Sequence, residues 1–483
     1  MVTKQFLKSS LIYSVVGALP YASGFLLLIW FTAYLTPAQF GINVLYISLM
    51  YFIQIISTFG LDASASLMYI DYRDDKPRLN EFMGTILYGL VGIGVLTFIV
   101  FSFGGFRLFS TSIIGRDLLE LIPFGIITIL SGIMNGIFKT YSTVLIYQQR
   151  PERFFFLNIS NFIITIGASL AILFAFPFTL YGPVIGRFIA IAFTAIISMV
   201  FLLKEYGFKG NRDFIKPIFI FAFPILIYGL LTWVVSYIDR FIIVRFMSDP
   251  TQVAIFDFGV KIVLGIELLL IGLVNAVNPK LFNIWKEKSL NESTVEINRY
   301  YNGMTALFLL MIPLFVIFAP ILIPIVIHKE VYYEAFGFLA ILAAGYLMRI
   351  WFYMYLAPLL YFKKTKALPR VFAISAIIDV ILGIFLIKYF GLIGAVWTNF
   401  LIKPVQALLL YLECRKVYTF KINPWKIFYT PIIFILTVLL SETFAPAHLK
   451  FQIELLQLFV AAGLVYFAYR KELWPMLRKF TGR

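Results

Sequence analysis

The sequence consists of repeated apolar blocks of roughly 20 residues, the length that an α-helix needs to cross the hydrocarbon core of a bilayer. Blocks such as Leu26–Phe31 do not alternate apolar with polar residues, so they favour helices over the strands of a membrane barrel. Only 13% of the residues are charged and 61% are hydrophobic, unlike a soluble domain. We therefore expect an all-α polytopic membrane protein.

Charged or turn-rich breaks between the apolar blocks set the limits of the predicted spans. They predict 14 transmembrane helices, near residues 9–33, 40–60, 82–104, 118–138, 154–175, 181–203, 216–239, 252–275, 302–326, 335–360, 370–388, 391–412, 427–443 and 451–469. The long connection 276–301 is amphipathic and predicts a surface helix that bridges two halves of the chain.

Lys and Arg are distributed unevenly over the connections between these spans. Of the 40, the set of connections that includes both termini holds 29, the opposite set holds seven, and four lie within spans. Because cytoplasmic loops carry the excess of basic residues, both termini are predicted to be cytoplasmic. This placement accounts for the net charge of +16 without a nucleic-acid partner.

An internal repeat divides the chain. The segment 37–42 (PAQFGI) is echoed 213 residues later by 250–255 (PTQVAI), and Tyr147 is matched by Tyr361. Near-constant offsets indicate two parallel six-helix lobes related by an axis along the membrane normal. We predict an N-terminal lobe at 1–208, a C-terminal lobe at 209–420, and two additional helices with a basic tail at 421–483.

Ionisable residues inside the spans are the candidate functional residues, because a charge at the bilayer centre costs at least ~2.5–3.5 kcal/mol. Asp257 and Lys261 are four residues apart and can pair on one helix face. Arg349 and Lys403 have no acidic neighbour at helical spacing, so their alternatives are a pair across helices or a role in binding. The basic set outnumbers the deep acidic set and predicts a cationic cavity for an anionic cargo; its members are Arg187, Lys261, Arg349 and Lys403.

Four carboxylates are candidates for coupling to H+ or Na+, since a buried carboxylate can titrate near neutrality: Asp62, Asp257, Glu267 and Asp379. The sequence has no glycine-rich ATP-phosphate loop, and its two histidines, His328 and His448, lack metal-ligand spacing. We therefore expect no catalytic residue, no metal and no cofactor, and a secondary transporter rather than an enzyme.

Several short motifs occur in a familiar order. They are LTPAQFG at 35–41, FGLD at 59–62, YQQRP at 147–151, Asp239-Arg240, IFDFGVK at 255–261 and KKTK at 363–366. Together they resemble the polysaccharide transporter family of the MOP exporter superfamily, the O-antigen and capsule repeat-unit flippases.

The resemblance implies a two-lobed fold with twelve core spans and a cationic cavity that opens alternately to either side. It implies as cargo an undecaprenyl-pyrophosphate-linked oligosaccharide, moved from the cytoplasmic to the periplasmic leaflet of a bacterial inner membrane and coupled to an ion gradient. A polysaccharide polymerase and a chain-length regulator are the candidate protein partners.

Other functions stay open from the residues alone. A peptidoglycan-precursor flippase has the same superfamily and span number, whereas a multidrug exporter is disfavoured by the basic set. A membrane-embedded glycosyltransferase or polymerase would need a sizeable loop with acidic or histidine groups, and the sequence has none.

Overall fold

A computed structural model describes residues 13, 16–288, 290–444 and 447–480. All regular structure in these ranges is helical, without a strand. Twelve helices within them are long and apolar enough to cross a membrane. The prediction of an all-α, multi-pass membrane protein is confirmed.

The chain forms two compact units, the first ending at Ala254 and the second beginning at Ile255. Each is described by itself. The lobe boundaries after residues 208 and 420 stay predictions; in the contacts, the helix that follows residue 208 belongs to the first unit.

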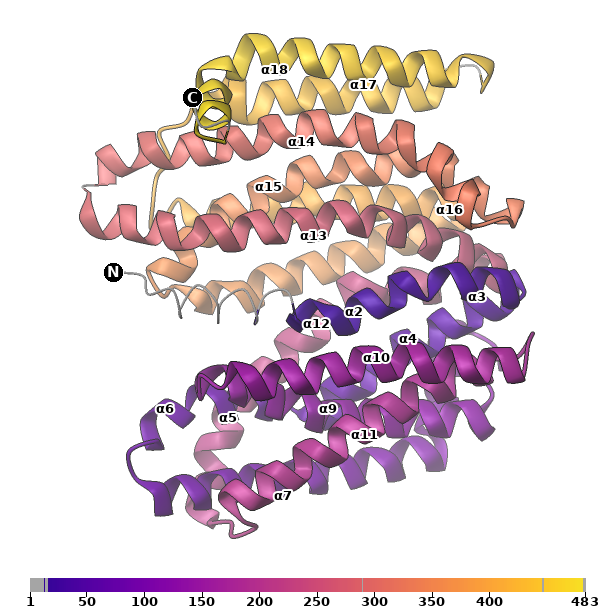
Figure 1. Ribbon diagram of the computed structural model, residues 1–483, viewed down its shortest axis with the longest axis vertical. Coiled ribbons are helices and arrows are strands. Elements are labelled where there is room, and N and C mark those ends of the chain that lie inside the picture. The colour runs from indigo at the N-terminus through magenta and orange to yellow at the C-terminus, as the bar shows by residue number, and fades with distance from the viewer. Residues whose placement is uncertain (1–12, 14–15, 289, 445–446, 481–483) are drawn as a thin grey trace. The chain divides into compact units, whose positions relative to one another are not determined.

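The first unit contains eleven labelled helices. They are α2 (Gly17–Leu26), α3 (Leu28–Tyr34), α4 (Pro37–Thr58), α5 (Leu61–Leu67), α6 (Tyr69–Tyr72), α7 (Lys76–Val100), α8 (Phe106–Phe109), α9 (Ile126–Tyr147), α10 (Pro151–Ala175), α11 (Tyr181–Tyr206) and α12 (Ile215–Met247). α9 packs against α4, α5 and α11, and α10 lies along α11 (Figure 1). The central position of α9 lets its side chains meet those of several other helices.

The second unit is built from six helices. They are α13 (Pro250–Glu287), which starts at the end of the first unit, α14 (Leu290–Val326), α15 (Leu339–Tyr361), α16 (Leu368–Cys414), α17 (Thr430–Phe444) and α18 (Lys450–Phe480). α15 packs against α16, and α17 and α18 pack against each other and against α14. Short π or 3-10 turns occur at Phe101–Gly105, Ser110–Ile114, Leu121–Gly125, Arg212–Phe214, Glu330–Gly337, Thr365–Ala367, Trp425–Tyr429 and Ala447–Leu449.

The turn between α4 and α5 illustrates how local sequence positions the candidate site. α4 begins at a capping box, in which Thr36 and Gln39 exchange side-chain and backbone hydrogen bonds. It ends where Phe59 and Gly60 adopt left-handed conformations, with φ of 52° and 75°. A Cβ at Gly60 would lie 2.5 Å from the Ala222 carbonyl, so only glycine fits this turn. The chain therefore reverses sharply and places Asp62 in the first turn of α5.

Several predicted span limits differ from the observed helices. α16 covers both predicted spans 370–388 and 391–412 and is broken at Gly391, where φ is 61° and ψ is −137°. The prediction of a separate surface helix at 276–301 is wrong, because α13 continues to Glu287 and α14 begins at Leu290. Part of the first predicted span, 9–33, lies outside the described residues, so the total of fourteen stays a prediction.

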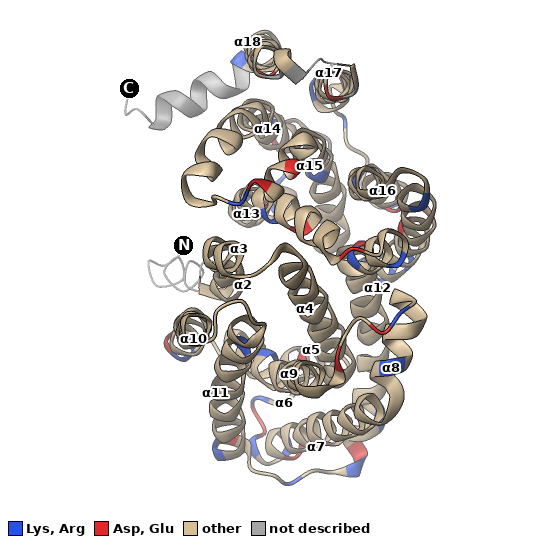
Figure 2. Ribbon diagram, turned by 90° about the vertical axis from the view of Figure 1, so that its right-hand side faces the viewer, with Lys and Arg blue, Asp and Glu red and all other residues tan. Residues whose placement is uncertain are grey.

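Charged residues are sparse along the helices of both units. Figure 2 shows mostly tan ribbon, with short blue and red segments. Charges that lie within the apolar spans therefore stand out as the residues to explain.

Candidate functional site

The first unit encloses a polar cavity of about 330 Å³ between α4, α5, α9 and α12. Its lining combines aromatic rings with hydroxyl, amide and charged groups. The polar members are Tyr51, Gln54, Thr58, Asp62, Lys139, Tyr228, Thr232, Ser236 and Tyr237. A cavity with an apolar wall and a few convergent polar groups is typical of a ligand site.

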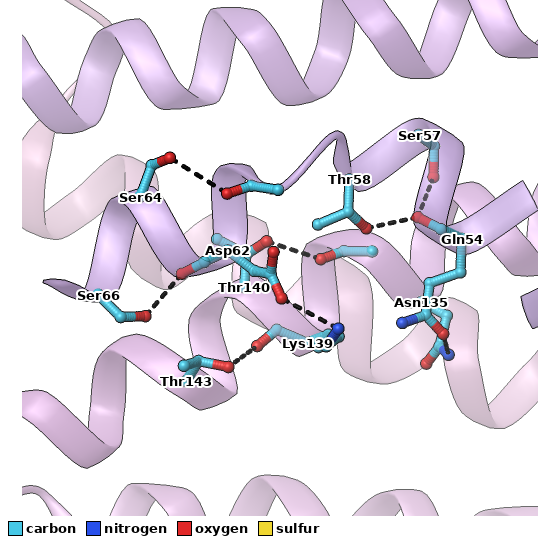
Figure 3. A network of polar contacts seen from close by, with 12 residues as sticks. Gln54, Ser57, Thr58, Asp62, Ser64, Ser66, Asn135, Lys139, Thr140 and Thr143 are labelled. Atoms are coloured by element: carbon cyan, nitrogen blue, oxygen red, sulfur yellow. Dashed lines mark hydrogen bonds and ion pairs between the residues drawn. The ribbon is translucent and has the colours of Figure 1, made fainter. Parts of the chain in front are cut away.

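An ion pair between Asp62 and Lys139 forms part of this lining. Lys139 Nζ lies 3.0 Å from Asp62 Oδ2, as Figure 3 shows. The Asp62 side chain is 12% exposed and that of Lys139 47%, so the carboxylate is the buried partner. The sequence placed Lys139 in a connection after residue 138, but α9 continues to Tyr147. Because the predicted span ended at residue 138, Lys139 was not recognised as the ion-pair partner of Asp62.

Amide groups continue the polar network toward the middle of α4. Asn135 Nδ2 donates to Gln54 Oε1 at 2.5 Å, and the Gln54 carbonyl accepts from Thr58 Oγ1 at 2.5 Å (Figure 3). α9 approaches α4 closely through glycines: a Cβ at Gly136 would lie 2.8 Å from Thr58 Oγ1. Such small residues allow helices in a membrane to form short interhelical hydrogen bonds.

Arg187 lies on α11, half-buried beside a small cavity that Asn43 also lines. Its guanidinium lies near Tyr51 and Tyr237, whose rings stack with centroids 5.5 Å apart. Both tyrosines line the 330 Å³ cavity. Arg187 thus lies behind the wall of that cavity, whereas Lys139, which the sequence reasoning omitted, lines it directly.

In the second unit, Arg349 of α15 is half-buried. Its Nη1 donates to Gln406 Oε1 at 2.7 Å, and its guanidinium carbon lies 4.3 Å from the Phe352 ring centroid. Within the described residues, its contacts are to an amide and to aromatic rings rather than to a carboxylate. Its positive charge is therefore oriented but not neutralised by a direct ion pair.

Tyr346 lies one turn before Arg349 and joins two other predicted residues. Its hydroxyl donates to Glu267 Oε2 at 3.2 Å. The ammonium of Lys403 lies 5.1 Å from its ring centroid and donates to Asn399 Oδ1 at 2.5 Å. Tyr346 has no charge and was not found by the search for charged residues in spans.

The two remaining predicted residues of α13 form the ion pair expected from their spacing. Lys261 Nζ lies 2.8 Å from Asp257 Oδ2 on adjacent turns of the helix. Asp379, on α16, is fully buried. Across the described ranges, no group of three or more His, Cys, Asp or Glu residues could hold a metal ion.

These contacts define two chemically different polar regions. The first unit has a cavity in whose lining a carboxylate and a lysine neutralise each other. The second has a cluster in which Arg349 is held by neutral partners. A fixed, partly desolvated guanidinium binds phosphate or carboxylate strongly, because it can donate two parallel hydrogen bonds.

The fold is that of known helical transporters. The structure of the lipid II flippase MurJ in an inward closed conformation superposes with a TM-score of 0.71, 14% identity, and coverage of 95% of this chain and 99% of that one. An inward-facing multidrug resistance MATE transporter of the MOP superfamily superposes with a TM-score of 0.68 and 14% identity. The match covers 83% of this chain and 94% of that one. A MOP superfamily transporter from Pyrococcus furiosus, with a binding pocket of reverse polarity, superposes with a TM-score of 0.60 and 11% identity. The match covers 85% of this chain and 95% of that one.

The chain therefore shares its fold with these membrane transporters. The polysaccharide biosynthesis protein family matches residues 6–285, more than half of the sequence, and the chain belongs to that family. A comparison with curated proteins finds no match. The predicted family is thus confirmed by the sequence match, and the predicted all-α, multi-pass fold by the structure.

Proposed function

We propose that this protein is a flippase for an undecaprenyl-pyrophosphate-linked oligosaccharide, an O-antigen or capsule repeat unit. In this proposal it works in a bacterial inner membrane with both termini cytoplasmic. It moves the cargo from the cytoplasmic to the periplasmic leaflet by alternating access, coupled to an H+ or Na+ gradient. Membership of the polysaccharide biosynthesis protein family supports the cargo class.

The environment of Arg349 is the observation that carries the proposal. A cation within a transmembrane helix is costly, and pairing it with a carboxylate would be the usual remedy. Arg349 instead contacts Gln406 and aromatic rings. An anionic cargo such as pyrophosphate would supply the missing negative charge, and Lys403 is the second candidate to contact it.

The four carboxylates are the candidates for coupling in this proposal. Asp62 and Asp257 each hold a lysine at ion-pair distance, and Glu267 accepts a tyrosine hydroxyl. Protonation or Na+ binding at such a carboxylate would release its partner and change the local charge. That is the kind of local change that can shift a transporter between two conformations.

A peptidoglycan-precursor flippase is the second candidate. It is favoured by the MurJ structure, which matches 95% of this chain, compared with 83% for the inward-facing MATE transporter. The same cationic cluster would serve either pyrophosphate-linked cargo.

Complementation of surface-polysaccharide export in bacteria that lack their own repeat-unit flippase tests the proposal. The chain is compared with Arg349→Ala, Arg349→Lys and Lys403→Ala at matched membrane abundance. Lys388→Ala is the control, because Lys388 is an exposed cation of the same unit. We expect Arg349→Ala to reduce export about tenfold or more, since a charge-assisted hydrogen bond contributes roughly 1.5–3 kcal/mol.

Each outcome has a defined meaning. Export by wild type, lost in Arg349→Ala and retained in Lys388→Ala, supports an anionic cargo bound at Arg349. Normal export by Arg349→Ala would contradict that role. Failure of wild type in all polysaccharide strains, with rescue of a strain that lacks its peptidoglycan-precursor flippase, would establish the second candidate.

A further inference from the structure

One corner of the second unit carries an unusual concentration of positive charge. The segment after α15 and the two ends of α16 surround a cavity of about 640 Å³. Its charged lining consists of one carboxylate, Glu413, and five cations, Lys363, Lys364, Lys366, Arg370 and Lys416. The cavity lies away from the Arg349 cluster, at an end of the helices predicted to face the cytoplasm.

The single carboxylate does not balance the five cations. Glu413 lies 2.7 Å from Lys416 Nζ and 4.0 Å from Arg370 Nη1, and its side chain is only 17% exposed. Glu413 is therefore already engaged by two basic residues. In the part of the chain that the structure describes, Lys363, Lys364 and Lys366 have no ion pair. The cavity consequently has a surplus of positive charge.

The start of α16 adds to this surplus. Its N-terminus has no side-chain cap and no acidic residue in the first turn, where Arg370 lies instead. A cation is disfavoured at a helix N-terminus, and Glu413, 4.0 Å from Arg370, offsets its charge only in part because Lys416 shares the same carboxylate.

In the first unit, the basic residues at the corresponding helix ends are neutralised by acidic residues of the chain itself. Gln149 and Lys363, in the two repeat-related connections, both have left-handed φ values, 56° and 55°. In the first unit, however, Glu205 forms ion pairs with both Arg150, at 2.6 Å, and Arg153. Glu152 provides the acidic residue in the first turn of α10. The same local geometry thus holds two acidic side chains, Glu152 and Glu205, in the first unit, and one, Glu413, among five cations in the second.

We infer that the cavity bounded by Lys363, Lys364, Lys366, Arg370, Glu413 and Lys416 is a binding site for a phosphate-bearing anion. Lysine and arginine clusters at a membrane surface attract phosphate groups. The phosphate can belong to the headgroup of an anionic lipid or be free in solution. The site does not depend on the cargo proposed above.

Binding to the purified full-length protein in detergent tests the inference. The probes are dioctanoyl phosphatidylglycerol, dioctanoyl phosphatidylcholine and inorganic pyrophosphate, each titrated at fixed ionic strength. The site variant is Lys364→Gln with Lys366→Gln. The control is Arg212→Gln with Lys216→Gln, which removes the same charge from exposed positions of the first unit. Melting temperatures without ligand confirm that both variants fold.

We expect phosphatidylglycerol to bind wild type and the control variant equally, and the site variant about tenfold more weakly. If pyrophosphate also binds wild type and loses affinity in the site variant, the site accepts a phosphate that is free in solution. If only phosphatidylglycerol loses affinity in the site variant, the site is specific for a lipid headgroup. Equal binding by the site variant, an equal loss in the control variant, or equal affinity for phosphatidylcholine would overturn the inference.

Discussion

The cavity of the first unit and the Arg349 cluster of the second differ in how their charges are balanced. In the first, Asp62 and Lys139 neutralise each other at the edge of a cavity. In the second, Arg349 contacts an amide and aromatic rings. The same contrast recurs at the ends of the helices, where Glu205 pairs with two arginines but Glu413 faces five cations.

This contrast shows that similar local geometry does not require a similar charge balance. Helix starts and turns are similar at repeat-related positions, because they depend on local residues such as Pro37 and Pro250. Charge balance depends on side chains that the repeat does not conserve between its two copies. The second unit therefore has surplus positive charge on the same type of scaffold.

The largest effect is expected at the ion pair of the first unit. Asp62→Asn leaves Lys139 without its carboxylate and should lower the free energy of unfolding by about 1 kcal/mol, a modest value because Lys139 is half exposed. Lys139→Gln in the same chain should recover part of this loss. A double-mutant cycle by denaturant unfolding in detergent measures the coupling.

Asp74→Asn, at an exposed position, is the control for loss of one negative charge. Strictly additive effects of Asp62→Asn and Lys139→Gln would show that the two residues have no coupling energy. The ion pair of the first unit would then not differ energetically from the Arg349 cluster of the second.

A smaller effect is expected from Glu205 and Glu413, the carboxylates that pair with basic residues at the helix ends of the two units. Glu205→Gln leaves Arg150 and Arg153 without their shared partner and should destabilise the protein by roughly 0.5–1 kcal/mol. Glu413→Gln should cost less, because its two partners are more exposed, and it should strengthen pyrophosphate binding by removing a negative charge. Thermal unfolding and anion titration of both variants measure these effects. Weaker pyrophosphate binding by Glu413→Gln would contradict the assigned surplus of positive charge.

The smallest effect on stability is expected at Gly345. A Cβ there would lie 3.0 Å from Lys403 Cδ and 3.3 Å from its Nζ, so Gly345→Ala should displace this flexible side chain. Unfolding free energy should change by less than about 1 kcal/mol, since alanine also favours the helix. Export in the complementation assay should nevertheless fall.

Gly463→Ala is the matched control, because that helical glycine has open space around it. Equal export by the two variants would show that the position of Lys403 has no role in transport.

Much of the fold follows directly from the sequence. Apolar blocks of membrane-spanning length give the helices, because backbone groups in a bilayer must be hydrogen-bonded within their own segment. The pair of Asp257 and Lys261 was also predictable, since a helix brings residues four apart onto one face. The position of a helix end was harder to predict: α9 extends beyond residue 138, and this extension moves Lys139 from a connection into the site.

The sequence by itself determined that this chain is a helical membrane protein, which residues carry charge into the apolar spans, and to which family it belongs. Only the tertiary structure decided which charges on separate helices are neutralised. Asp62 meets Lys139, and Arg349 meets Gln406, across 77 and 57 positions of sequence. Such partners depend on how separate helices pack, and their energies depend on the distance and burial that packing creates.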